Sequence, residues 1–182
     1  MQLTVAAATA LWRAIHEETG LSPEIKWPND ILIRGKKVVG ILTELSAEVD
    51  RVKHVILGVG VDVNLTANEL PVELRKIATS LRIETGEPVL RPELATSILR
   101  ELDRDYARIC AGKFAEVADE WEEHCSTIGQ RVVIAMAFDV GAGLDQQSKG
   151  FEVAMRGRKV QRRGIVGKIT LVEVGAARDQ QA

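Results

Sequence analysis

Residues 24–45 read EIKWPNDILIRGKKVVGILTEL, and this stretch decides the fold of the chain. Two apolar runs, 31–33 and 38–45, flank a polar RGKK segment in which Gly35 can adopt the positive φ of a hairpin turn. A third run at 55–64 follows the polar connection SAEVDRVKH. Short polar connections favour an antiparallel meander over βαβ units, because a parallel pair needs a crossover of a dozen or more residues.

The same stretch places a lysine at the end of a strand and directly before a stiff turn. Pro28 fixes its own φ, and it restricts Trp27 before it to extended geometry. Asn29 and Asp30 are turn-forming residues. Most lysines are solvated surface groups, but a compact cation held in this way suits a negatively charged reacting group such as an acyl-phosphate. Lys26 is therefore the first candidate for chemistry.

The rest of the first 125 residues is predicted to be mainly helical. Helical spacing of apolar residues ends at Gly20, and further helices are predicted at 68–81, 91–112 and 113–125. The apolar stripe of the long helix comprises Leu94, Ile98, Leu102, Tyr106 and Ile109. The strand runs are too continuously apolar to be half-solvated, so we expect the buried face of the sheet to be well covered, with the first helix as its natural cover.

The pattern of the sequence changes after residue 127. Short β-like runs broken by glycine extend over about 45 residues, a length that suits a small SH3-like barrel. The predicted fold class is therefore α/β, in its α+β form: a mixed or antiparallel sheet covered by helices at 1–125, then the barrel at 126–175. Residues 176–182 are predicted to be a disordered tail.

Composition excludes several classes of protein. The 182 residues carry a net charge of −2, which argues against a dedicated nucleic-acid binder. The two cysteines, Cys110 and Cys125, form no CxxC pair and read as thiols of a reducing compartment. The histidines are scattered, so no metal site is predicted. The N-terminus lacks a basic signal region, and no apolar segment approaches the ~20 residues of a membrane span, so a cytoplasmic protein is expected.

Two further patterns have a structural and a functional interpretation. Gly58 and Gly60 suggest a dinucleotide loop, but no third glycine follows and no helix begins after them, so close backbone approach within a strand is the better interpretation. The basic run at 156–168 is either the outer face of barrel strands or a patch that steers an acidic partner.

The sequence resembles the biotin–protein ligases. The segments that carry the resemblance cover nearly the whole chain: KWPND (26–30), KKVVGILTEL (36–45), ILGVGVDVN (56–64), ATSL (78–81), RPELATSILRELDRDY (91–106), GLDQQ (143–147) and GKITLVEV (167–174). KWPND followed by GIL is the specific block.

The resemblance implies an ATP-dependent and Mg-dependent ligase that forms biotinyl-AMP and transfers biotin to a lysine of the biotin carboxyl carrier protein. Lys26 is implied to bind the biotin carboxylate and the α-phosphate. The strand residues Gly40, Ile41 and Leu42 are implied to line the biotin pocket. The nucleotide contacts are implied to be Asn29 and, from a loop after that strand, Ser46 and Ala47.

The chain also departs from the family's pattern. The Gly-Arg-rich biotin loop of the family precedes the part that matches here, so we expect a truncated form with impaired activity. The family usually has Asn at the position of Asp62, and often Gly at that of Ala47. The alternatives are a non-catalytic remnant that binds protein and, with less support, a nucleic-acid-binding barrel. Exposed strand edges would favour a homodimer.

Overall fold

The computed structural model describes residues 2–47, 52–135 and 150–154. The chain divides into two compact units, Met1–Ser126 and a second that begins at Thr127. In the second unit, β5 (Arg131–Ala135) pairs antiparallel with β6 (Gly150–Ala154). The remainder of the predicted barrel, the predicted tail and the basic run at 156–168 lie outside the described residues.

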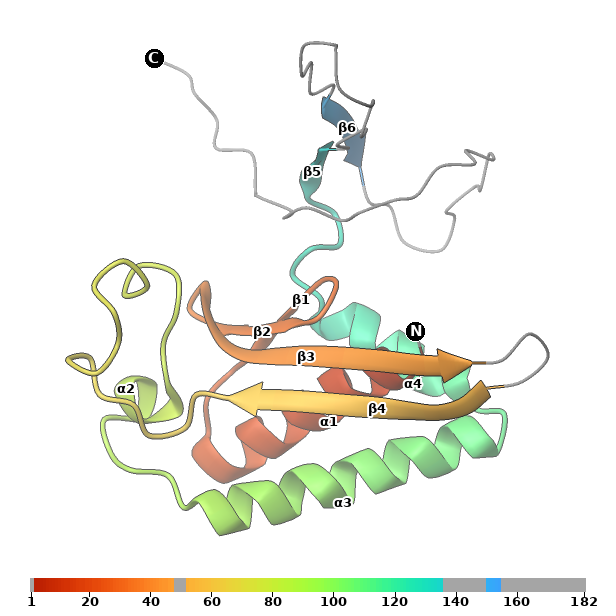
Figure 1. Ribbon diagram of the computed structural model, residues 1–182, viewed down its shortest axis with the longest axis horizontal. Helices are drawn as coiled ribbons and strands as arrows, with labels where there is room; N and C mark the ends of the chain where they lie inside the picture. Colours follow the sequence, from red (N-terminus) through yellow and green to blue (C-terminus); the bar gives the residue numbers. More distant parts are fainter. Residues whose placement is uncertain (1, 48–51, 136–149, 155–182) are drawn as a thin grey trace. The chain divides into compact units, whose positions relative to one another are not determined.

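The first unit is built on a four-stranded antiparallel sheet in the order β1-β2-β3-β4 (Figure 1). Its strands are β1 (Glu24–Lys26), β2 (Asp30–Ile33), β3 (Lys36–Ala47) and β4 (Val52–Val61). Arg34 and Gly35 both have positive φ, at 50° and 74°, and close the hairpin between β2 and β3. The predicted meander is therefore confirmed, and every pair in this sheet is antiparallel.

Helices cover one face of this sheet. α1 (Gln2–Thr19) lies against β1, β2 and β3, and α3 (Arg91–Cys110) and α4 (Phe114–His124) pack on α1 (Figure 1). The core between sheet and helices contains Leu11, Ile15, Ile25, Ile31, Val39 and Ile41, all at most 2% exposed. Within the described part of the chain, no helix has the length and apolarity needed to cross a bilayer.

The first helix covers the buried face of the sheet as predicted, but no described element covers the opposite face, so the expectation that β3 and β4 are not half-solvated is wrong. Leu42 is 60% exposed and Ile56 is 54% exposed. Side chains of a strand alternate between the two faces, and Val39 and Ile41 already occupy the helix-covered side. Gly40 and Leu42, which alternate with them along β3, therefore face away from the core, and no described element covers Leu42 or Ile56.

The predicted helix at 68–81 is also wrong. This segment forms isolated turns, closed for example by the Leu74 N–H on the Pro71 carbonyl, and the helix α2 spans only Leu81–Thr85. Proline cannot donate a helical hydrogen bond. The end of the segment is instead drawn into a parallel bridge between Lys37 and Ala78. Pairing with the sheet therefore overrides the local helical pattern.

The buried side of α3 matches its predicted apolar stripe only in part. Leu94 is buried, and Ile98 and Leu102 pack against the core. Tyr106, however, is 52% exposed, and Glu101 and Asp105 are buried. Arg13 of α1 pairs with both of these carboxylates and with Glu120 of α4. Burial lowers the pKa of Arg13, but its hydrogen bonds to the three carboxylates raise that pKa by more, so that it lies above its ordinary value. This cluster of charges joins the three helices.

Candidate functional site

The open face of the sheet carries a row of four paired residues. Lys26 lies opposite Asp30, Asp30 opposite Gly40, and Gly40 opposite Gly60, one residue from each strand. Directly opposed residues in antiparallel strands present their side chains on the same face. The row therefore has a cation and a carboxylate on β1 and β2, and bare backbone on β3 and β4.

On β4 the bare backbone is not required by the packing of the chain itself. A Cβ on Gly60 would come no closer than 4.0 Å to the Gly40 carbonyl oxygen, and one on Gly58 no closer than 3.6 Å to the Leu42 carbonyl oxygen. Both are ordinary contact distances. Glycine within a strand often marks a place where a ligand or another backbone approaches closely. The glycines thus form a flat floor on the open face, within strand β4 and not in a dinucleotide loop.

The lysine at the end of this floor is not neutralised by its neighbour. Lys26 is partly buried at the end of β1. The carboxylate opposite it, on Asp30, instead forms an ion pair with Lys37, whose Nζ lies 2.6 Å from Oδ1. No carboxylate among the described residues pairs with Lys26. Its ammonium is therefore available to an anion that approaches over the floor.

The turn that follows Lys26 is fixed to β3. Asn29 accepts a hydrogen bond from the Ile41 N–H through its main-chain oxygen, at 2.9 Å, and donates one from Nδ2 to the Ile41 carbonyl, at 2.7 Å. The Trp27–Pro28 peptide bond within the turn is cis. The side-chain nitrogen of Asn29 thus has a structural partner, and its predicted nucleotide contact stays a prediction.

A second carboxylate lies just beyond the floor. Asp62 follows the last residue of β4, and its N–H donates to the Val38 carbonyl at 2.9 Å. Burial raises the pKa of Asp62, and the positive charge of Lys37 lowers it in part. Lys37 therefore interacts with two carboxylates, Asp30 of β2 and Asp62 just after β4.

The structure separates the remaining predicted site residues. Gly40 and Leu42 are on the open face, whereas the Ile41 side chain is 2% exposed and belongs to the core. Ser46 and Ala47 are the last residues of β3, so the expectation that they form a loop is wrong. Ser46 is six positions along β3 from Gly40, a distance of roughly 20 Å. Their nucleotide contact remains a prediction.

Lys37 was missed by the sequence reasoning. It stands in the RGKK segment, which has the composition of a solvated hairpin turn. The signal that could have found it is its position on the far side of the turn from Asp30, but only the register of β2 and β3 shows that the two side chains meet.

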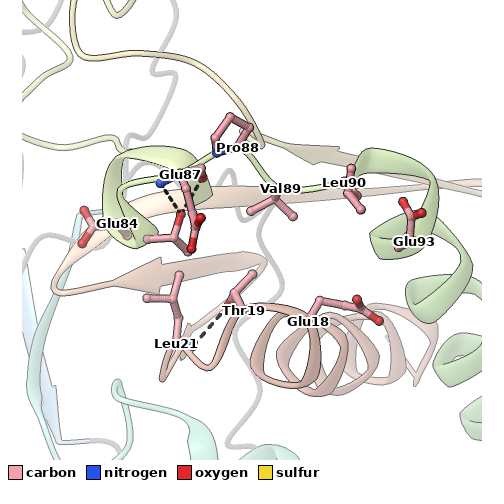
Figure 2. A pocket seen from close by; sticks show the side chains of 10 residues that line it. Glu18, Thr19, Leu21, Glu84, Glu87, Pro88, Val89, Leu90 and Glu93 are labelled. Carbon is pink, nitrogen blue, oxygen red and sulfur yellow. Dashed lines mark hydrogen bonds between the residues drawn. The ribbon is translucent and has the colours of Figure 1, made fainter.

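A separate pocket of about 450 Å³ lies between the end of α1, α2 and the start of α3 (Figure 2). Four of its ten lining residues are glutamates: Glu18, Glu84, Glu87 and Glu93. Such a lining repels anions. The anion-binding candidate is therefore the open face that carries Lys26 and not this pocket.

Metal binding has no obvious protein site in residues 2–47, 52–135 and 150–154. No group of three histidine, cysteine, aspartate or glutamate residues there could hold an ion. Magnesium is commonly held by one or two carboxylates together with the phosphates of a substrate. A dedicated cage is thus unnecessary for a nucleotide-bound ion.

Comparison with known proteins gives the same family as the sequence motifs. Residues 1–62 match the Biotin/lipoate A/B protein ligase family. The bifunctional ligase/repressor BirA of Bacillus subtilis is 45% identical over 128 residues, which cover 70% of this chain and 39% of that protein. The biotin–[acetyl-CoA-carboxylase] ligase of Paracoccus denitrificans is 31% identical over 135 residues, 72% of this chain and 56% of the relative. The chain thus spans about two fifths of the length of the first of these relatives.

Solved structures agree with this assignment. The apo biotin protein ligase of Aquifex aeolicus superimposes with a TM-score of 0.69 at 27% identity, over 85% of this chain and 62% of that one. The complex of the Aquifex enzyme with biotin and ATP gives a TM-score of 0.65 at 26% identity, over 85% of this chain and 61% of that one. The resemblance that KWPND and GIL indicated, and the α+β fold with an antiparallel sheet, are therefore confirmed.

Proposed function

We propose that this relative of the biotin protein ligases acts in biotin transfer, with the open face of its sheet as the biotin-binding surface. The biotin carboxylate would attack the α-phosphate of ATP and release pyrophosphate, which gives biotinyl-AMP. The amine of a lysine on the biotin carboxyl carrier protein would then attack the acyl carbon and release AMP. The expected compartment is the cytoplasm.

One observation carries this proposal: the Lys26 ammonium, which has no carboxylate partner among the described residues, lies at the end of a glycine floor. Biotin has a compact apolar ring system and a chain that ends in a carboxylate. A flat floor next to Leu42 offers apolar contact to the ring system. Lys26 offers a charge-assisted hydrogen bond to the carboxylate at the other end.

The chemistry of adenylation explains why a cation is needed at this position. A carboxylate and a phosphate are both anions, and their approach is unfavourable unless a fixed positive charge lies between them. A lysine at the end of a strand, followed by a turn that two hydrogen bonds fix to β3, is held before the substrates arrive. Removal of such a group typically raises the activation free energy by ~3 kcal/mol, which slows the reaction by about two to three powers of ten.

The nucleotide side of the site is less defined. Asn29, Ser46 and Ala47 stay the proposed nucleotide contacts, although Ser46 and Ala47 lie far along β3 from Lys26. Magnesium would be held mainly through the ATP phosphates.

Exchange of labelled pyrophosphate into ATP, dependent on biotin, tests the proposal. We expect exchange with the unmodified chain. In Lys26→Ala the exchange rate should fall 100-fold or more, which is the typical effect of removing one fixed charge from a transition state. Lys26→Arg should recover little, because a planar guanidinium does not replace a compact ammonium.

Glu24→Ala, two residues earlier on the same strand, is the matched control and should retain exchange. Biotin binding without any exchange would favour the non-catalytic binding protein. Full exchange by Lys26→Ala would remove Lys26 from the proposed role.

A further inference from the structure

Lys37 lies where three of the motif segments meet. Its N–H donates to the Ile77 carbonyl at 2.8 Å, and its carbonyl accepts from the Thr79 N–H at 2.9 Å. Its side chain crosses the face of Gly40, since Cε and Nζ lie 3.3 Å from the position that a Cβ there would occupy. Nζ then reaches Oδ1 of Asp30 at 2.6 Å. The main chain is thus held from one side while the ammonium extends over the floor.

The position of Asp30 gives this ion pair its significance. Asp30 is directly opposite Lys26 in the pairing of β1 and β2. Opposed Cβ atoms in antiparallel strands are about 5 Å apart, so a lysine and an aspartate in such a pair can readily form an ion pair. Here the Asp30 carboxylate is engaged by Lys37. Lys37 thus occupies the carboxylate that would otherwise be free to pair with Lys26.

We propose that Lys37 is a positioning residue, which holds the Asp30 carboxylate and so leaves the Lys26 ammonium to an anionic substrate. The inference rests on the proposed role of Lys26. It also gives Gly40 a specific function, because a side chain there would meet Cε and Nζ of Lys37 on their path to Asp30.

The expected kinetic effect follows from competition. Without Lys37, Asp30 pairs with Lys26, and biotin must displace it before its own carboxylate can bind. Such a displacement weakens ground-state and transition-state binding alike, which raises KM and leaves kcat unchanged. For Lys37→Met we expect KM for biotin to rise about tenfold, the scale of one charge-assisted hydrogen bond, with kcat within twofold. Lys36→Met removes the neighbouring charge and should change neither constant.

A second substitution separates this role from a purely structural one. In Lys37→Met the addition of Asp30→Asn removes the competing carboxylate, so most of the loss in KM should be recovered. A variant impaired only by faulty folding would not be rescued by a second change on the neighbouring strand. An unchanged KM in Lys37→Met, or a double variant as impaired as the single one, overturns the inference.

A crystal structure of Lys37→Met tests the inference without any activity. We expect Lys26 Nζ within ion-pair distance of the Asp30 carboxylate in that variant. If the two groups stay apart, the inference is wrong even where Lys26 proves essential. If pyrophosphate exchange is absent in the unmodified chain but the new ion pair forms, the proposed function fails and the relation between the two lysines stands.

Discussion

A methyl group on the glycine floor should change stability and ligand affinity in opposite directions. In Gly60→Ala the new Cβ meets nothing closer than the Gly40 carbonyl oxygen at 4.0 Å, so the folded state accepts it without strain. Alanine also loses less conformational entropy on folding than glycine. We therefore expect the free energy of unfolding to stay constant or to rise by about 0.5–1 kcal/mol.

Affinity for biotin should fall in the same variant, because the methyl group stands on the surface over which the ligand lies. Overpacking of a fitted contact typically costs 1–3 kcal/mol, which corresponds to roughly 10- to 100-fold weaker binding. Urea denaturation followed by circular dichroism measures stability, and calorimetric titration with biotin measures affinity. Leu45→Ala, which shortens an exposed side chain near the end of β3, is the control and should bind biotin normally. Unchanged affinity for biotin in Gly60→Ala would show that the glycine floor is not the biotin-binding surface. If stability falls together with affinity, the weaker binding comes from a disturbed fold.

Further expectations concern the charges that join the helices. Arg13→Met leaves Glu101, Asp105 and Glu120 without their shared partner and should lower the free energy of unfolding, measured by urea denaturation, by about 3 kcal/mol or more. Arg100→Met removes only an exposed pair with Glu17 and should lower it by less than about 1 kcal/mol. Equal losses would contradict a buried network. Burial raises the pKa of Glu101, but its hydrogen bond and proximity to Arg13 lower it below the ordinary value. The stabilisation is therefore complete above the unfolded pKa of about 4.3 and is lost as pH falls through the folded value. Glu101→Gln should flatten the fall in unfolding free energy below about pH 4, and an unaltered pH profile would contradict this origin.

The sheet could be predicted from sequence because its determinants are local. Each strand between Glu24 and Val61 has its own apolar run, and the turn at Gly35 has the residue type that its positive φ demands. The Lys26–Asp30 segment was likewise found from the restrictions that Pro28 places on its neighbours. These signals act over a few residues, where the chain's own stereochemistry decides the outcome.

The open face was not predicted because glycine hides the alternation of polar and apolar side chains along a strand. In VILGVGVDV, residues 55–63, Gly58 and Gly60 stand at positions where a polar side chain would have marked a solvated face. The run therefore reads as continuously apolar and suggests burial on both sides. The strand in fact exposes Ile56, on the open face, by 54%.

The other errors come from contacts between residues distant in sequence. The buried acids of α3 are tolerated because Arg13, about 90 residues earlier in the chain, meets them. The predicted helix at 68–81 loses to a bridge with Lys37. The pairing of Lys37 with Asp30 depends on the register of two strands. Such effects require the three-dimensional arrangement and have no signature in local composition.

The most direct test of the biotin surface is an NMR titration of the ¹⁵N-labelled chain with biotin. The account predicts shifts of amide signals in Lys26, Gly40, Gly58 and Gly60, and their loss in Lys26→Ala. Amides around the acidic pocket, such as those of Glu18 and Glu87, should stay in place. Shifts confined to that pocket, or no shift of the glycine signals at millimolar biotin, would contradict the assignment of the open face.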